Sequence, residues 1–134
     1  MRYNISEGYS QKLSIGRITI YTDLCTGITY LAYRHFLSSS FTPMVNTDGS
    51  YVTQYKHERF GFELLDDTLL KHMPILGQES HSRISYYREW GTGVIYVLRS
   101  SFLTANLTPL VKEDGTYLSF EEWEDMHSIE QPSF

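Results

Sequence analysis

One segment of this chain occurs twice. Residues 14–52 read SIGRITIYTDLCTGITYLAYRHFLSSSFTPMVNTDGSYV, and residues 80–118 read SHSRISYYREWGTGVIYVLRSSFLTANLTPLVKEDGTYL. The two segments align without a gap at an offset of 66 residues, and 15 of the 39 aligned positions are identical. Unrelated segments do not share this many residues, so we infer a duplication in which each copy is one supersecondary unit.

Each copy has the pattern of an antiparallel meander. Residues 17–22 (RITIYT) alternate and are rich in β-branched side chains, which predicts a strand, and residues 28–37 predict its hairpin partner. The connection between them closes on Gly27, where φ is expected to be positive. Residues 41–45 (FTPMV) predict a third strand at a sheet edge, because their proline cannot donate to a ladder. An Asp-Gly turn then leads to a short fourth strand at Tyr51.

The segments that follow the two copies differ. Residues 62–73 (FELLDDTLLKHM) have helix-like apolar spacing and end before a proline, which predicts a helical connector. Residues 120–130 predict a C-terminal helix, which opens with a capping box of Ser119 and Glu122. A four-stranded unit of about 40 residues buries too little surface to be stable alone.

We therefore predict one domain over residues 1–134, of the α+β class and mainly antiparallel β. It would consist of two tandem four-stranded meander repeats, residues 14–52 and 80–118, with a short helix after each. The two repeats are expected to share one core and to be related by a pseudo-two-fold axis, as in an ancestral isologous dimer.

Composition and charge restrict the class of protein. The 134 residues are 41% hydrophobic and 20% charged, as in folded soluble domains. The net charge of −5 disfavours binding to duplex nucleic acid, which normally requires a basic field. The single cysteine, Cys25, excludes an intrachain disulfide, and no apolar run approaches the ~20 residues that span a bilayer. Because the N-terminal residues also lack the apolar core of a signal peptide, we expect a cytoplasmic protein that does not associate with membranes.

Two strings in the first copy match a known pattern. Residues 20–31 (IYTDLCTGITYL) and 41–49 (FTPMVNTDG) are similar to D-x-x-T-G-V-x-Y-L and T-P-L-x-x-x-x-G, with Ile28 in place of the valine and Met44 in place of the first leucine after the proline. On these motifs the chain resembles a short uncharacterised domain family of Gram-positive bacteria and their phages. The resemblance covers residues 20–49 and 86–115, and the second copy departs from the pattern at Glu89, which replaces the aspartate. It implies a small β-rich module of phage type and no particular activity.

The first predicted strand of each copy carries candidate ligand-binding residues. The isoleucines of the first copy share one face, so Arg17 and Tyr21 share the other, and Arg83 and Tyr87 correspond to them in the second copy. Arginine beside tyrosine can pair with an anion and stack on a planar ring. The alternative, to which we give more weight, is cross-strand packing in which the arginine covers a tyrosine or pairs with an acid.

The second predicted strand has diverged between the copies. Tyr33, Arg34 and His35 stand where the second copy has Arg99 followed by two serines. Drift at exposed positions is the simpler explanation of this difference. The other explanation is specialisation of one half, in which Tyr33 and Arg99 line an asymmetric pocket near the dyad, together with Arg34 and His35.

No motif for catalysis, for a metal site or for a phosphate-binding loop occurs in the sequence. We therefore expect a non-enzymatic binding module without a cofactor or metal. Its preferred form sequesters a small anionic, nucleotide-like ligand through Arg and Tyr surfaces, as a phage-encoded antagonist of host defence would do. A small hydrolase whose groups meet only in the fold is the weaker alternative.

A second interpretation is an acidic inhibitor or adaptor that docks on a basic host protein. The docking element would be the acidic helix, through Glu121, Glu122, Trp123, Glu124 and Asp125. The alternative is an ordinary amphipathic helix that packs Trp123 on the core, and we consider it somewhat stronger. The identity of the ligand or partner stays open at this point, as does the oligomeric state, a homo-oligomer included.

Overall fold

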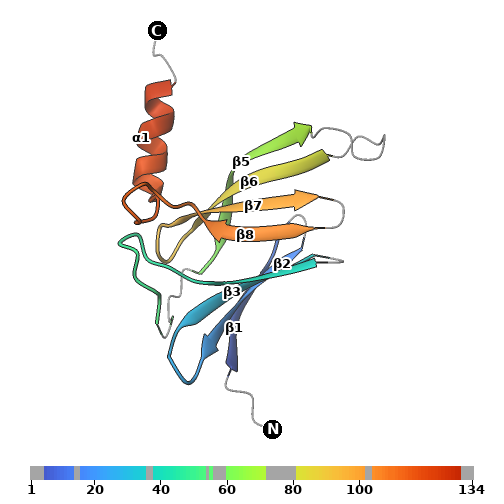
Figure 1. The fold of residues 1–134 in the computed structure, drawn as a ribbon, viewed down its shortest axis with the longest axis vertical. Helices are drawn as coiled ribbons and strands as arrows, with labels where there is room; N and C mark the ends of the chain where they lie inside the picture. The colour runs from blue at the N-terminus through green and yellow to red at the C-terminus, as the bar shows by residue number, and fades with distance from the viewer. Residues whose placement is uncertain are drawn as a thin grey trace.

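The described part of the chain folds into two four-stranded antiparallel sheets followed by one helix (Figure 1). The computed structural model describes residues 5–13, 16–35, 38–53, 55, 60–71, 81–101 and 104–130. The first sheet is a meander of β1 (Ile5–Lys12), β2 (Arg17–Asp23), β3 (Thr29–His35) and β4 (Ser38–Pro43). The second is a meander of β5 (Phe62–Lys71), β6 (His81–Glu89), β7 (Ile95–Ser101) and β8 (Ala105–Pro109), and the helix is α1 (Phe120–Glu130). The prediction of a mainly antiparallel β chain with two four-stranded units is confirmed.

One strand of each sheet was assigned wrongly from the sequence. The segment at Tyr51 forms only an isolated bridge to Val45, and the fourth strand of the first sheet is β1, which precedes the repeat. In the second sheet that place belongs to β5, so the helical connector predicted at residues 62–73 is wrong. A bulge between Leu64 and Asp66 interrupts the alternation of β5, and this hides the period of two that identifies a strand. Residues 72 and 73 lie outside the described part.

β1 and β5 are equivalent strands with unrelated sequences. Ser10 lies opposite Thr19 in the first sheet, and Asp67 lies opposite the corresponding Ser85 in the second. Both strands also have their bulge at the same level of the sheet. These pairs place β1 and β5 at an offset of 57 residues, whereas the rest of the repeat has an offset of 66, so the next connection is nine residues longer in the second copy. The structural repeat therefore begins earlier than the sequence repeat.

The two sheets turn opposite faces inward. The first sheet buries Ile18, Ile20, Leu31 and Tyr33, none of them more than 2% exposed. Their equivalents in the second sheet, Ile84, Tyr86, Val97 and Arg99, are half-buried or exposed, and that sheet buries Ser85, Tyr87, Tyr96 and Leu98. Neighbouring side chains of a strand point to opposite sides, so a shift of burial by one residue means that the other face is inside.

This burial pattern does not support the predicted pseudo-two-fold arrangement. A two-fold axis would map the interior onto itself and would bury equivalent residues to the same extent in both copies. Instead, the Tyr at position 33 is fully buried and its equivalent, Arg99, is exposed. The divergence between the second strands of the copies therefore has a packing explanation.

Several contacts join the two sheets. The Gln11 side chain forms two hydrogen bonds with the backbone of Phe62, one from Nε2 to the carbonyl oxygen (2.9 Å) and one from the amide to Oε1 (2.6 Å). At the other edge, the Leu107 amide donates to Ser40 Oγ at 3.2 Å. The main cluster of buried hydrophobic residues includes Ile18 and Tyr87, from different sheets. Strand β4 thus lies against β8, and Gln11 near the end of β1 is tied to the first residue of β5.

Helix α1 covers part of the outward face of the second sheet. The predicted capping box is present: the Glu122 amide donates to Ser119 Oγ (3.2 Å), and the Ser119 amide donates to Glu122 Oε1 (3.1 Å). The rings of Trp123 and Tyr86 lie 5.0 Å apart, which attaches the helix to the sheet. In the described part of the chain no helix covers the first sheet in this way (Figure 1).

Candidate functional site

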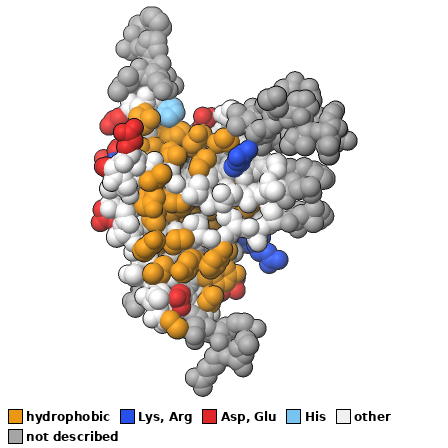
Figure 2. All heavy atoms as spheres, in the orientation of Figure 1, with side chains coloured by type: hydrophobic (Ala, Val, Ile, Leu, Met, Phe, Trp, Pro, Cys, Tyr) orange, Lys and Arg blue, Asp and Glu red, His pale blue; other side chains and the backbone are white. Residues whose placement is uncertain are grey.

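The outward face of the first sheet, which we call the open face, carries basic and aromatic side chains in ordered rows. Strand pairing places Lys12, Arg17, Arg34 and Ser39 in one row, Ser10, Thr19, Ala32 and Phe41 in the next, and Glu7, Tyr21, Tyr30 and Pro43 in the third. Positive charge is therefore concentrated at one end of the face, and the rings lie beside it. Figure 2 shows hydrophobic side chains gathered over both sheets on the side in view, with basic side chains at their border.

Three rings form the aromatic part of the open face. Phe41 is 55% exposed and is stacked on Tyr30, with ring centroids 4.8 Å apart and planes inclined by 8°. The ring of Tyr21 lies 6.4 Å from the ring of Phe41 and is tilted against it by 48°. Exposed aromatic rings that are held in place by neighbours are suited to stacking against a planar ligand.

Both arginines of the open face lie in the row next to the one that holds Phe41, so an anion bound beside these rings would be close to them. The Arg17 guanidinium donates to Ser10 Oγ at 2.9 Å, and this bond holds the side chain over the sheet. Arg34, which is exposed, lies directly opposite Arg17 across the strand pair. A depression of about 420 Å³ is lined by Ile5, Tyr21, Ala32, Arg34, Ser39, Ser40 and Phe41. Its described lining residues supply one cation, two rings and several hydroxyl groups.

The structure brings together three of the eight predicted ligand residues. Arg17, Tyr21 and Arg34 share the open face. His35 is half-buried at the end of β3, next to the same row but on the opposite side of the strand. The neighbouring rings of Tyr30 and Phe41 were missed, because nothing in the repeat shows which of two equivalent positions is exposed.

The other four predicted residues lie elsewhere. Tyr33 and Tyr87 are buried in the core, at 0% and 5% exposure, and are not available to a ligand on the surface. Burial, together with the neighbouring Tyr87 hydroxyl, raises the pKa of Tyr33 to about 12. Arg83 forms an ion pair with Asp67 (2.9 Å), which is the cross-strand alternative considered for it, and Arg99 is exposed on the outward face of the second sheet. The symmetric groove expected near a dyad is therefore not formed by these residues.

A buried carboxylate was also not anticipated as a key residue. Glu89 has no exposed surface, and its two oxygens accept hydrogen bonds from the Gly91 and Thr92 amides and from the Thr92 and Tyr55 hydroxyls, at 2.7–3.0 Å. Asp23, its equivalent, accepts corresponding bonds from the following turn. This position thus organises the turn in both copies, and we assign it a structural role.

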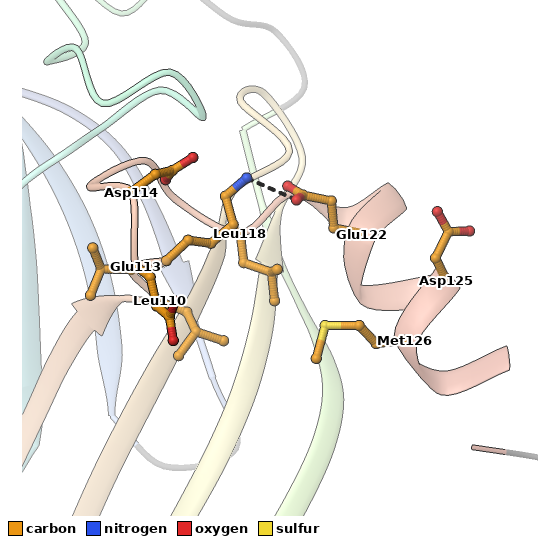
Figure 3. Close-up of a pocket in the computed structure, with 9 residues that line it drawn as sticks. Leu110, Glu113, Asp114, Leu118, Glu122, Asp125 and Met126 are labelled. Atoms are coloured by element: carbon orange, nitrogen blue, oxygen red, sulfur yellow. Dashed lines mark hydrogen bonds and ion pairs between the residues drawn. The ribbon is translucent and has the colours of Figure 1, made fainter. Parts of the chain in front are cut away.

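A second hollow, which we call the groove, lies between the turn after β8 and helix α1 (Figure 3). It has a volume of about 780 Å³ and is lined by Leu110, Val111, Lys112, Glu113, Asp114, Leu118, Glu122, Asp125 and Met126. We call its apolar lining residues the floor (Leu110, Val111, Leu118 and Met126) and its carboxylate lining residues the rim (Glu113, Asp114, Glu122 and Asp125). Lys112 Nζ is paired with Glu122 Oε2 at 2.8 Å, as the dashed line in Figure 3 marks.

The predicted docking helix contributes to this groove with two of its five residues. Glu122 and Asp125 line the groove, whereas Glu121 and Glu124 lie on other parts of the helix surface. Trp123 is half-buried and packs on the second sheet, which agrees with the packing alternative for this side chain.

Comparison with known proteins yields no relative. No family model matches the chain, and there is no match among the curated proteins or the solved structures. The resemblance to the family of Gram-positive bacteria and phages therefore stays a prediction. Within the described residues, no helix has the length and apolar character needed to cross a membrane, and no three His, Cys, Asp or Glu side chains are grouped to hold a metal ion.

Proposed function

We propose that this protein is a binding module that holds a small, planar, anionic ligand of nucleotide-like chemistry on the open face. The observation that carries the proposal is the arrangement of Phe41, Tyr30 and Tyr21 beside the row of Arg17 and Arg34. A base would stack on the exposed ring of Phe41, and a phosphate group would lie toward the guanidinium groups. These two contacts are enough to hold the ligand. A sequestering module of phage type would need no catalytic turnover.

The proposal includes one such site in each chain. We propose that the two sheets enclose a common core. The second sheet then buries the face that is equivalent to the open face, and that face cannot bind a ligand. The supporting observation is that Tyr96 and Leu107, the equivalents of Tyr30 and Phe41, are at most 1% exposed. A ligand would therefore bind with a stoichiometry of one per chain, in spite of the duplication.

The direct test is a calorimetric titration of the full chain with adenosine 5′-monophosphate, adenosine and inorganic phosphate. The nucleotide should bind more tightly than either part, because only the nucleotide makes the ring and anion contacts together. Arg34→Ala should weaken nucleotide binding about tenfold, through loss of a hydrogen bond to a charged group. Phe41→Ala should weaken it by a similar factor, through loss of stacking.

The matched control is Arg83→Ala, which removes the arginine of the second copy that is equivalent to Arg17. Its side chain is also exposed, and it is paired with Asp67 and lies away from the open face. Nucleotide affinity should not change in this variant. If Arg83→Ala and Arg34→Ala weakened binding equally, or if none of the three probes bound at millimolar concentration, the proposal would be wrong.

A further inference from the structure

The turn that forms one side of the groove has a counterpart in the first copy, and the two turns differ in what covers them. Met44 and Val45 are the equivalents of Leu110 and Val111, and they are 0% and 1% exposed. The second sheet lies over them, and the Val45 amide donates a hydrogen bond to the Tyr96 hydroxyl at 3.3 Å. Val111, in contrast, is 60% exposed. The same turn is therefore closed by an aromatic hydroxyl in one copy and open to solvent in the other.

The uncovered turn presents both apolar surface and a backbone donor. Two hydrogen bonds cross the turn: the Lys112 amide donates to the Thr116 carbonyl oxygen, and the Leu118 amide donates to the Leu110 carbonyl oxygen. The amide of Val111, which lies between Leu110 and Lys112, therefore points away from the turn. Among the described residues no acceptor is found for it, whereas the equivalent amide of Val45 has the tyrosine hydroxyl. Met126 of α1, which is 50% exposed, extends the apolar floor on the far side (Figure 3).

The rim of the groove is negatively charged. The rim consists of Glu113, Asp114, Glu122 and Asp125, and the one cation among the described lining residues, Lys112, is already paired with Glu122. Hydrogen bonds from Thr116 lower the pKa of Asp114, and the Lys112 ammonium lowers the pKa of Glu122, so both carboxylates are ionised at neutral pH. An occupant that complements this rim carries positive charge at its borders.

We infer that the groove docks a segment of another protein in which a tyrosine stands between apolar residues and lysines or arginines flank them. The tyrosine hydroxyl accepts the hydrogen bond of the Val111 amide, as Tyr96 does for Val45 within this chain. The apolar neighbours cover Val111 and Met126, and the basic residues meet the carboxylates of the rim. Tyrosine and arginine are also among the residues enriched at the energetic centres of protein interfaces. This inference is independent of the ligand proposed for the open face.

The test uses four synthetic peptides and fluorescence anisotropy with the full chain. The probe is KKLYLKK, and the others are KKLFLKK without the hydroxyl, KKSYSKK without the apolar neighbours, and EELYLEE with reversed charge. The probe should bind, KKLFLKK should bind about fivefold more weakly because one hydrogen bond is lost, and EELYLEE should not bind. Equal affinity for KKLYLKK and KKSYSKK would show that the apolar floor plays no part and would overturn the inference.

Two charge-reversal variants test whether the peptide binds in the groove or is attracted only by the negative charge of the protein. Asp125→Lys should weaken binding of KKLYLKK about threefold at low salt, since the charge pairs are exposed. Glu124→Lys is the matched control, because it makes the same charge change on the same helix at a residue that does not line the groove. Equal effects of the two changes would overturn the inference. Concentration-dependent dimerisation that KKLYLKK reverses would assign the groove to a second copy of this chain and would overturn it as well.

Discussion

The two sheets bury opposite faces, so substitution by alanine at equivalent positions of the two copies should lower the free energy of unfolding by very different amounts. Leu107 and Phe41 occupy the same place in the repeat, but Leu107 is 1% exposed and Phe41 is 55% exposed. Leu107→Ala removes three buried carbon atoms at about 0.8 kcal/mol each and leaves a cavity, so the free energy of unfolding should fall by about 3 kcal/mol. Phe41→Ala removes a larger side chain, yet it should lower that free energy by less than ~1 kcal/mol, because most of the ring is already in water.

The other face supplies the reciprocal pair. Leu31 has no exposed surface, and its equivalent, Val97, is half-buried on the outward face of the second sheet. Leu31→Ala should again lower the free energy of unfolding by about 3 kcal/mol, and Val97→Ala by about 1 kcal/mol. The sensitive position thus changes face between the two copies.

Urea denaturation followed by circular dichroism measures all four variants, and thermal melting gives a second readout. For a chain of this length about 3 kcal/mol corresponds to a decrease of roughly 10 °C in Tm. The result that would refute the reasoning is equal destabilisation by Leu107→Ala and Phe41→Ala. It would mean that both sheets bury the same face and that the open face is not open.

Three further predictions concern local features. Gly16→Ala should destabilise the fold by at least about 2 kcal/mol more than Gly93→Ala in urea titrations. Both glycines have positive φ, but a Cβ on Gly16 would collide with the Arg34 carbonyl oxygen, whereas a Cβ on Gly93 would meet open space. Glu89→Gln places an amide group against backbone donors, so the free energy of unfolding should fall by about 2–3 kcal/mol, and an unchanged urea midpoint would contradict its structural role. Burial raises the pKa of Tyr33 to about 12 in the folded state. The contribution of its neutral hydroxyl to stability is therefore complete below pH ~10 and is lost as the pH rises from about 10 toward 12. Tyr33→Phe should flatten that part of a plot of unfolding free energy against pH.

Turn chemistry is the part of this protein that can be read from residue types alone. Gly27 and Gly49 have positive φ, as do their equivalents in the second copy, because no Cβ obstructs that conformation. Asp48 accepts hydrogen bonds from the Ser50 amide and hydroxyl, which is the role expected of an Asp-Gly turn. The capping box of α1 depends in the same way on residues three positions apart. These features are local, so the duplicated segment predicts them well.

The first strand of each sheet could not be found in this way. β1 and β5 lie outside the sequence repeat, and a bulge in each breaks the alternation that identifies a strand. What makes them strands is the unpaired edge of the neighbouring hairpin, which offers backbone donors and acceptors to any segment that can reach it. The connector that resembled a helix is extended for this reason.

The face that each sheet turns inward, and with it the candidate site, depends on the tertiary structure. Both faces of the first sheet carry large apolar side chains, Ile20 and Leu31 on one and Tyr30 and Phe41 on the other, so alternation along the strands does not distinguish inside from outside. The choice is made by contacts between residues far apart in the chain, such as Gln11 with Phe62. Local sequence specifies two similar units, and contacts made in the tertiary structure decide which face of each unit is buried and which equivalent face stays exposed.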